Sequence, residues 1–447
     1  MKIFQKKYLL ALLVLLTVQV GYARQWTLRQ CIDYALENNI ALRKSLLSRQ
    51  SAAEDVLQSQ SALLPSLNMS TSHNVTYRPW PANGSSTIAG SYVQSSVDKV
   101  YYNGSYGVNA NWTVWNGNRN VNTVKLNKLA EEKAGLEASV TANSIQEQIA
   151  QLYVQILYSV EAIEVNRQSL ATSKKNEERG QAFLEVGKMS KADVAQLTAQ
   201  RAQDEYAVVE AESALRNYKR QLKQLLQITD EEEFDIVIPQ TTDEMALQDI
   251  PSVSSVYASA LESRPEIKSA QLSVSSGELA VKIAKAQWLP TLGLSASAVT
   301  NTTSMSNNAW TRQLKTNFDM GAGITLSIPL FDNRQARTAV NKAQLQQQSY
   351  LLDLDDKRTT LYSTVESYWL QAVTNQNKFK AAQVSVESQK TSYELLSEQF
   401  RLGLKNIVEL MTGKNNLQAA QQNELQSKYL SILNIHMLTF YRDGKLQ

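Results

Sequence analysis

The stretch Leu64-Pro65-Ser66-Leu67 recurs 225 residues later as Leu289-Pro290-Thr291-Leu292. At the same offset, Ala35-Leu36-Glu37 recurs as Ala260-Leu261-Glu262. Downstream, an Asn-Arg pair stands at 118–119 and again at 333–334, and beyond it the offset settles at 216. Because self-similarity at a fixed offset is typical of a repeated structural plan, the chain is predicted to consist of two equivalent halves. Each half should run helix, strand, loop, strand, very long helix, turn and helix.

Two segments alternate between apolar residues and small polar residues, at 105–115 and at 320–329. Their partner strands are expected near 67–77 and 292–302, directly after the Leu-Pro motifs. Each segment has about ten residues, which is the length of a tilted strand that crosses a bilayer. A half-buried sheet in a soluble domain shows the same alternation, so the pattern alone leaves both readings open.

The residues from 336 to 400 contain no Gly and no Pro, and their apolar positions follow a heptad spacing that begins at Leu361. The same spacing holds 216 residues earlier, from Ile145. A helix of about 65 residues would extend roughly 100 Å, too long for a compact globule. Each long helix is predicted to end near a Gly, and the chain then returns as a second helix. The pattern therefore predicts two coiled-coil hairpins with tips, which a purely structural stalk would share.

Composition excludes several classes of protein. Gly and Pro together number 24 of 447 residues, so turns are few and a loop-rich enzyme is disfavoured. A single Cys excludes an internal disulfide framework, and two His residues are too few for a metal site built from several His ligands. No nucleophile–His–acid set can be built around His73 or His436. We therefore expect no enzymatic activity, no metal and no cofactor.

The N-terminus has the three-part pattern of a secretory signal peptide, with Lys residues followed by an apolar run and small residues. We expect residues 1–23 to be removed, the alternative being an uncleaved anchor helix. The mature chain then has 42 basic and 42 acidic residues, which gives no reason to expect a nucleic-acid partner. No later segment reaches 18 apolar residues, so membrane insertion would have to use strands.

The predicted class is a mostly α protein with a small transmembrane β part. The first repeat is assigned to 24–227, with a helical hairpin at 120–227 and a tip near 187–193. A linker or equatorial segment follows at 228–250. The second repeat is assigned to 251–447, with a hairpin at 335–441 and a tip near 403–409. Four strands cannot close a barrel, and an open edge in lipid leaves backbone groups unpaired. Two copies would give a narrow, filled eight-stranded barrel, so the small polar face favours three copies and twelve strands.

Taken together, these features resemble the TolC family of outer-membrane efflux proteins. The resemblance covers essentially residues 24–441 and rests on the order of the motifs, present twice. It implies a homotrimer in the outer membrane of a Gram-negative bacterium, in contact with outer-membrane lipid, with a 12-stranded barrel and a long periplasmic α-helical barrel. It further implies a passive exit duct for efflux or secretion, which docks with a periplasmic adapter protein and an inner-membrane transporter.

The family's tip pattern is a Gly, then a small polar residue three positions later, then an acid and aliphatic residues. It reads GKMSKADV at 187–194 and GLKNIVEL at 403–410. The resemblance implies that polar links between helix ends close the periplasmic entrance here. The candidates for this gate are Asp193, Phe400, Lys405 and Glu409. The candidates for contact with the adapter are Gly187, Lys188, Ser190, Gly403, Leu404 and Asn406.

Three departures from the family pattern change the expected gate. Phe400 stands in place of a Tyr and cannot donate a hydrogen bond. Thr412 stands in place of a second acid, and Lys405 in place of an Arg loses the bidentate fork. The closed state is therefore expected to rest on a Lys405–Asp193 link and on packing of Phe400. In the alternative reading, Asp193 is an acid favoured by the helix dipole and Lys405 is a solvated tip residue.

The rival function is a structural or adhesive trimeric stalk, anchored by a barrel but without transport. It would share the heptads but would need neither a gate nor an open lumen. Within the duct reading, secreted peptides or proteins are an alternative cargo to small molecules. The two extracellular loops, expected at 78–104 and 303–319, differ in length and show no readable role.

Overall fold

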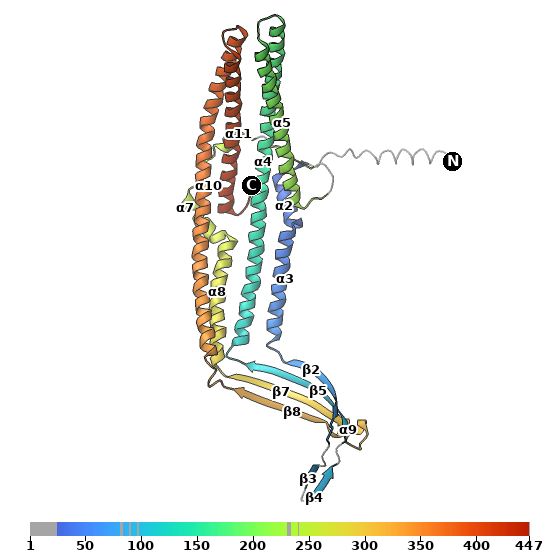
Figure 1. The fold of residues 1–447 in the computed structure, drawn as a ribbon. Helices are drawn as coiled ribbons and strands as arrows, with labels where there is room; N and C mark the ends of the chain where they lie inside the picture. The colour runs from blue at the N-terminus through green and yellow to red at the C-terminus, as the bar shows by residue number, and fades with distance from the viewer. Residues whose placement is uncertain are drawn as a thin grey trace, which may run out of the picture. The chain divides into compact units, whose positions relative to one another are not determined.

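The computed structural model describes residues 25–80, 84–88, 91–95, 98–229, 234–239 and 241–446. The expected signal peptide lies outside the described residues. The chain divides into two compact units, and each takes segments from both halves of the sequence (Figure 1). Unit 1 comprises Met1–Leu46, Leu136–Lys268 and Asp355–Gln447, and unit 2 comprises Leu47–Gly135 and Ser269–Leu354. The proposed boundaries between repeats and linker stay predictions.

Unit 2 is built on a four-stranded antiparallel sheet. Its strands are β2 (Ser66–Tyr77), β5 (Val100–Trp115), β7 (Thr291–Thr303) and β8 (Asp319–Ser327), in the spatial order β2-β5-β7-β8. The four strands predicted from the alternation are thus confirmed, and β5 begins five residues earlier than expected. Parts of α3 (Ile40–Ser61), α4 (Arg119–Glu185), α8 (Pro265–Lys285) and α10 (Gln335–Arg401) belong to the same unit, together with the short helix η1 (Ala286–Trp288).

The strand register separates the residues of the sheet into two chemically different faces. One rung across all four strands is Leu67–Ala110–Ala296–Ala322, and the next is Asn68–Asn109–Ser297–Gly321. Because successive side chains of a strand point to opposite faces, the first rung belongs to an apolar face and the second to a small polar face. Met69, on the apolar face, is 76% exposed, so this face is uncovered in the single chain.

Two small elements lie in the segments that were expected to be loops. The strands β3 (Gly84–Ile88) and β4 (Ser91–Ser95) pair with each other in a separate antiparallel sheet. The helix α9 (Trp310–Thr316) packs on β7, where Gln313 donates to the backbone of Thr303 and accepts from it. Neither element was predicted, because these segments contain no apolar periodicity longer than a few residues.

The repeated Asn-Arg motifs mark the turns that join the second strand of each half to its long helix. Gly117 and Asn118 both have positive φ angles before α4, and Asn333 and Arg334 both have positive φ angles before α10. Gly and Asn adopt this left-handed region more readily than most residues do. The same left-handed turn is thus built twice, by Gly117-Asn118 and by Asn333-Arg334, although the Asn-Arg pair is shifted by one residue between the two copies.

Unit 1 is helical. It contains α2 (Leu28–Asn38), α5 (Lys191–Leu226), α6 (Asp243–Ala246), α7 (Val253–Ser263) and α11 (Ile407–Asp443), together with most of α4 and α10. The helices α4 and α10 have 67 residues each, as the absence of Gly and Pro in 336–400 led us to expect. The heptad positions predicted on α10, from Leu361 to Phe400, are all buried or half-buried. They therefore form the seam of a coiled coil, which confirms the prediction.

The segment between the two halves is attached to unit 1 by a short strand. The strand β6 (Asp235–Ile236) pairs in parallel with β1 (Gln25–Trp26), and Tyr153 of α4 donates its hydroxyl to the carbonyl of Val237 at 2.6 Å. Further along, Ala246 of α6 packs against Phe379 and Ile432. This segment is thus bound along the helices rather than forming a domain of its own.

A buried Arg fixes the joint between α7 and α8. The Nη2 atom of Arg264 donates to Glu147 at 3.2 Å, and the guanidinium lies 3.6 Å from the ring centroid of Tyr441. Its Nε atom lies 3.7 Å from Glu266, which is ion-pair distance but leaves Nε without a hydrogen bond. At the equivalent joint between α2 and α3, Asn39 donates to the carbonyl of Leu225 at 3.0 Å. The same junction is thus stabilised by different side-chain contacts in the two halves.

Candidate gate at the hairpin tips

Both tips have the same local structure, and it explains the spacing of their residues. After α4, Gly187 has a φ of +74°, and Ser190 caps the start of α5. After α10, Gly403 has a φ of +75°, and Asn406 caps the start of α11. A Gly with positive φ ends a helix at little steric cost, and an N-cap residue three positions later starts the next helix. The tip pattern therefore encodes a tight turn between antiparallel helices.

The two tip acids complete capping boxes. Asp193 accepts hydrogen bonds through its Oδ2 atom from the backbone N–H of Ser190 at 3.3 Å and from its hydroxyl at 2.8 Å. Glu409 accepts from the backbone N–H of Asn406 at 3.2 Å. Each acid is the third residue of its helix, where it satisfies an otherwise unpaired backbone donor. This role alone accounts for an acid at 193 and at 409.

Lys405 contacts Glu409 within the chain. Its Nζ atom donates to Glu409 Oε1 at 2.5 Å, across one turn at the start of α11. This hydrogen bond, followed by the backbone bond from Asn406, lowers the pKa of Glu409 below its ordinary value. Asp193 and Lys405 therefore each have a partner on their own hairpin, and the link between Asp193 and Lys405 stays a prediction.

Phe400 is buried at the tip. It packs with Leu197, Ile407 and Leu410, and the half-buried Met189, Tyr393 and Met411 surround this cluster. Leu197 belongs to the first hairpin and the other three buried members to the second, so the cluster holds the two hairpins together. The role of Phe400 in the gate stays a prediction.

The residues suggested for adapter contact are all exposed: Gly187, Lys188, Ser190, Gly403, Leu404 and Asn406. Apolar side chains are exposed beside them, among them Val186 and Leu402. An added Cβ at Gly187 or Gly403 would meet no atom within 4 Å. Both tips thus present open surface on which another protein could dock.

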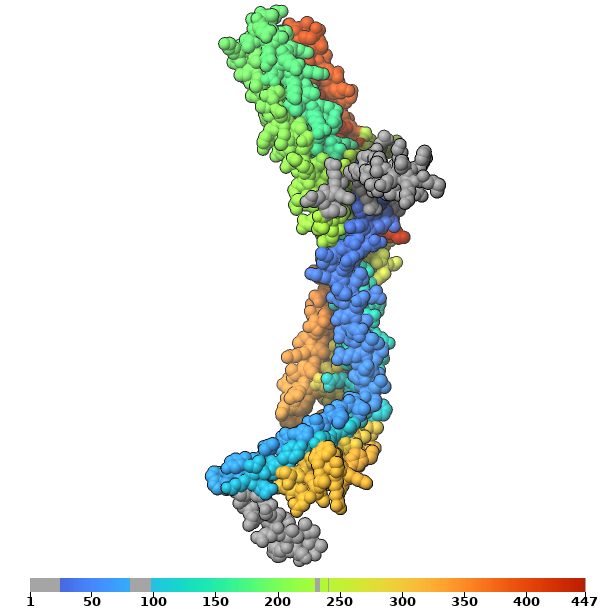
Figure 2. All heavy atoms as spheres, turned by 90° about the vertical axis from the view of Figure 1, so that its right-hand side faces the viewer, coloured from blue at the N-terminus to red at the C-terminus, as the bar shows by residue number. Residues whose placement is uncertain are grey.

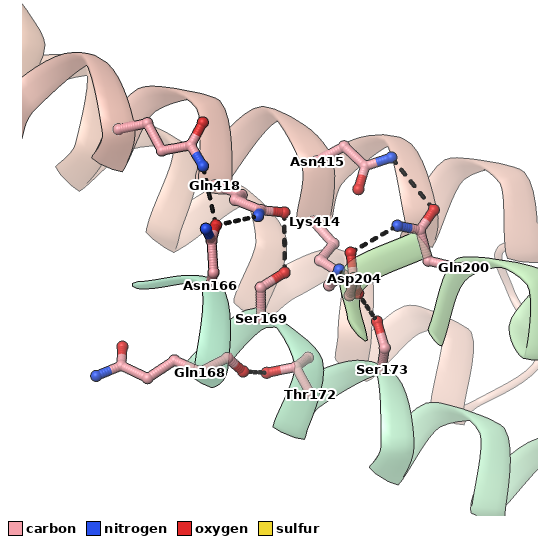
Figure 3. Close-up of polar contacts among 11 residues, drawn as sticks. Asn166, Gln168, Ser169, Thr172, Ser173, Gln200, Asp204, Lys414, Asn415 and Gln418 are labelled. Atoms are coloured by element: carbon pink, nitrogen blue, oxygen red, sulfur yellow. Dashed lines mark hydrogen bonds and ion pairs between the residues drawn. The ribbon is translucent and has the colours of Figure 1, made fainter. Parts of the chain in front are cut away.

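A buried polar layer below the tips was missed in the sequence. Lys414 of α11 and Asp204 of α5 form an ion pair, and their side chains are 5% and 4% exposed (Figure 3). Figure 2 shows the upper part of the first hairpin, in green, beside the second hairpin, in red. Burial lowers the pKa of Lys414 below its ordinary value, and the hydrogen bond to Asp204 offsets part of this lowering. The available signal was a polar stripe at heptad spacing on α4: Asn166, Ser169, Ser173 and Asn176.

The part of the chain that the structure describes contains neither a membrane-spanning helix nor a cluster of metal-binding side chains. No described helix is both long enough and apolar enough to cross a bilayer. Among the same residues, no group of three or more His, Cys, Asp or Glu side chains is placed to hold a metal ion.

Comparison with known proteins identifies the family. A model of the family described as "Outer membrane efflux protein" matches residues 31–227 and 256–433. The outer membrane efflux protein BepC of Brucella suis biovar 1 (strain 1330) is 23% identical over 436 residues, which cover 95% of this chain and 87% of BepC. The outer membrane protein TolC of Escherichia coli (strain K12) is 23% identical over 421 residues, which cover 91% of this chain and 80% of TolC.

A crystal structure of CusC, described in terms of folding and transmembrane channel formation, matches the fold. It superposes with a TM-score of 0.78 at 14% identity and covers 94% of this chain and 95% of CusC. The match to the family model covers most of the chain, and the strands and long hairpins have the fold of CusC. The chain therefore belongs to the outer membrane efflux protein family, the TolC-like channels of the bacterial outer membrane.

Proposed function

We propose that three copies of this chain form a closed twelve-stranded barrel, whose lumen continues into a periplasmic helical duct. The observation that carries this proposal is the four-stranded sheet, in which β2 and β8 each pair on one side only among the described residues. An edge strand within lipid would leave its backbone groups unpaired, at a cost of several kcal/mol each. Closure by neighbouring copies removes both edges, with the apolar face toward lipid and the small polar face toward the lumen.

The duct is closed at rest at the hairpin tips and is opened by a periplasmic adapter, which connects it to an energised inner-membrane pump. The exposed tip residues support the docking step. The gate consists of Asp193, Lys405 and Glu409, with Phe400 as the packed support. We assign the link between Asp193 and Lys405 to the closed state of the trimer, where it competes with the contact that each residue makes within its own hairpin. An exposed ion pair is worth about 0–1 kcal/mol, so three such links shift the equilibrium between the closed and open states only modestly toward the closed state.

The test is conductance in planar bilayers, with the mass of the protein in detergent measured beside it. The double variant Asp193→Ala/Lys405→Ala is expected to raise the small resting conductance of a trimer. The matched control is Arg401→Ala/Glu398→Ala, which removes an exposed ion pair near the same tip, with 2.9 Å between Nε and Oε2. Unchanged conductance in the double variant would remove these residues from the gate. A trimer silent in every form would favour the structural stalk.

A further inference from the structure

A single buried carboxylate joins three helices below the tips. Asp204 of α5 bonds through its Oδ2 atom to Lys414 Nζ of α11 and accepts from the hydroxyl of Ser173 of α4 (Figure 3). Its Oδ1 atom accepts from the side chain of Gln200 at 3.0 Å. The first hairpin is thus bound to α11 by a charge-assisted contact that is shielded from water.

Neutral amide and hydroxyl contacts continue the same seam along α11. Gln418 and Gln422 both donate to Asn166 Oδ1, at 3.0 and 2.9 Å. Ser169 donates its hydroxyl to Gln418 Oε1 at 2.9 Å. An amide carries both donors and an acceptor, so these partners can replace one another. This part of the seam, which we call the amide ladder (Asn166, Ser169, Gln418 and Gln422), does not by itself select one alignment.

The spacing of the polar residues makes a second alignment available. On α11, Lys414, Gln418 and Gln422 follow one another at intervals of four residues. A displacement of α11 by one turn, about 5.4 Å, would bring Gln418 to the level of Ser173 and keep polar groups facing polar groups. The same displacement would separate Lys414 from Asp204 and leave two buried charges unpaired, which is strongly unfavourable.

We propose that the Lys414–Asp204 pair is a register lock, which holds α11 in one of the alignments that the amide ladder permits. Buried ion pairs often add little stability compared with apolar residues of similar volume, whereas selection of a register is a well-attested use of buried polar groups. Lys414 lies little more than one turn from Glu409, so the register of α11 also determines where the second tip stands. This consequence for gating rests on the proposed duct function, while the lock itself does not.

The register can be measured by electron spin resonance, independently of transport. Spin labels at Ala199→Cys on α5 and Asn416→Cys on α11 occupy exposed positions. The only native thiol, Cys31, is fully buried, and burial raises its pKa to about 12, so labelling is selective. Labelled chains diluted among unlabelled chains report the distance within one chain.

The neutral variant Lys414→Gln/Asp204→Asn keeps side-chain size and hydrogen bonding but removes both charges. We expect the wild type to show one narrow distance, and the neutral variant to show a second distance whose population rises about tenfold. The charge-swapped variant Lys414→Asp/Asp204→Lys should return to one distance. The control Arg167→Gln/Glu212→Gln removes an exposed pair between α4 and α5, with 2.7 Å between Nη2 and Oε1, and should change nothing.

A single unshifted distance in the neutral variant would overturn the lock, whatever its conductance. If the neutral double variant does not fold, Asp204→Asn alone repeats the test, because Asn can still bond to Ser173 and Gln200. A shifted distance in a protein that never conducts would support the lock and refute the duct. A conducting wild type whose neutral variant keeps one distance would support the duct and refute the lock.

Discussion

The side chain of Leu197 on α5 fills the space that Gly180 leaves on α4, because a Cβ on Gly180 would overlap the Leu197 Cδ1 atom. In the second hairpin, 216 residues later, the large and small residues are exchanged. There Gly413 lies on the returning helix, and its Cβ would stand 2.6 Å from Leu396 Cδ1. The two hairpins therefore preserve the same close contact with the opposite choice of residues, and a duplicated seam has diverged without losing its packing.

Gly180→Ala should destabilise the first hairpin, although Ala is ordinarily the better helix former by about 1 kcal/mol. The added methyl group overlaps a Leu that is itself buried, which costs about 1–3 kcal/mol. The thermal unfolding midpoint of the detergent-purified protein measures the effect. Gly135→Ala is the matched control in the same helix, because its Cβ would lie 3.6 Å from the side chain of Arg49, an ordinary contact. A higher midpoint for Gly180→Ala than for this control would contradict the packing argument.

Arg264→Leu should lower the free energy of unfolding by about 3–5 kcal/mol, because it leaves Glu147 without its partner and removes the cation from the ring of Tyr441. Arg264→Lys should fall between this variant and the wild type, since Lys keeps the charge but loses the planar stack. The double variant Arg264→Leu/Glu147→Leu should recover most of the loss. Denaturant titration of the wild type, Arg264→Leu, Glu147→Leu and the double variant forms a double-mutant cycle, in which strict additivity would show that the pair is not coupled.

Ala296→Arg and Ser297→Arg should have opposite consequences, although the residues are adjacent in β7. Ala296 lies on the apolar face, where Arg in the middle of the bilayer costs about 2–4 kcal/mol. Ser297 lies on the small polar face, where Arg should leave stability nearly unchanged but alter the ion selectivity of the channel. Urea unfolding from lipid vesicles measures the first effect and bilayer recording the second. Equal destabilisation by both changes would mean that the two faces are not lipid and lumen.

The long elements were predictable from sequence because their patterns are long. Heptads from Leu361 to Phe400 and strict alternation over ten residues leave few alternatives, and repetition in both halves doubles the signal. The tips were predictable for a similar reason, because a Gly with positive φ followed by an N-cap residue is required by the turn itself. The returning helices were expected at 194–226 and 410–441, and α5 and α11 begin and end within three residues of these bounds.

The contacts that hold the helices in register were not predictable in the same way. A heptad is recognised by its apolar residues, whereas the seam of α4 that faces α11 is made of Asn and Ser. Which acid pairs with Lys414 depends on a contact across 210 residues of sequence, and no local pattern reports it. The contact between Lys405 and Glu409 is local, at four residues, and it was missed for a different reason: the family resemblance paired Lys405 with Asp193.

The cap of α11 should loosen in acid, because the pKa of Glu409 is lowered in the folded chain by Lys405 and by the N–H of Asn406. A carboxyl group with a lowered folded pKa contributes stability that is fully present above its unfolded pKa, 4.5, and is lost as the pH falls through the folded value. A spin label at the exposed position Val408→Cys should therefore become more mobile between neutral pH and about pH 3. Glu409→Gln should make the label's mobility nearly independent of pH, and Lys405→Met should move the transition to higher pH, since it removes the main cause of the shift. A wild-type label that stays equally ordered over the whole range, or a Gln variant that still responds, would show that this cap does not control the second tip.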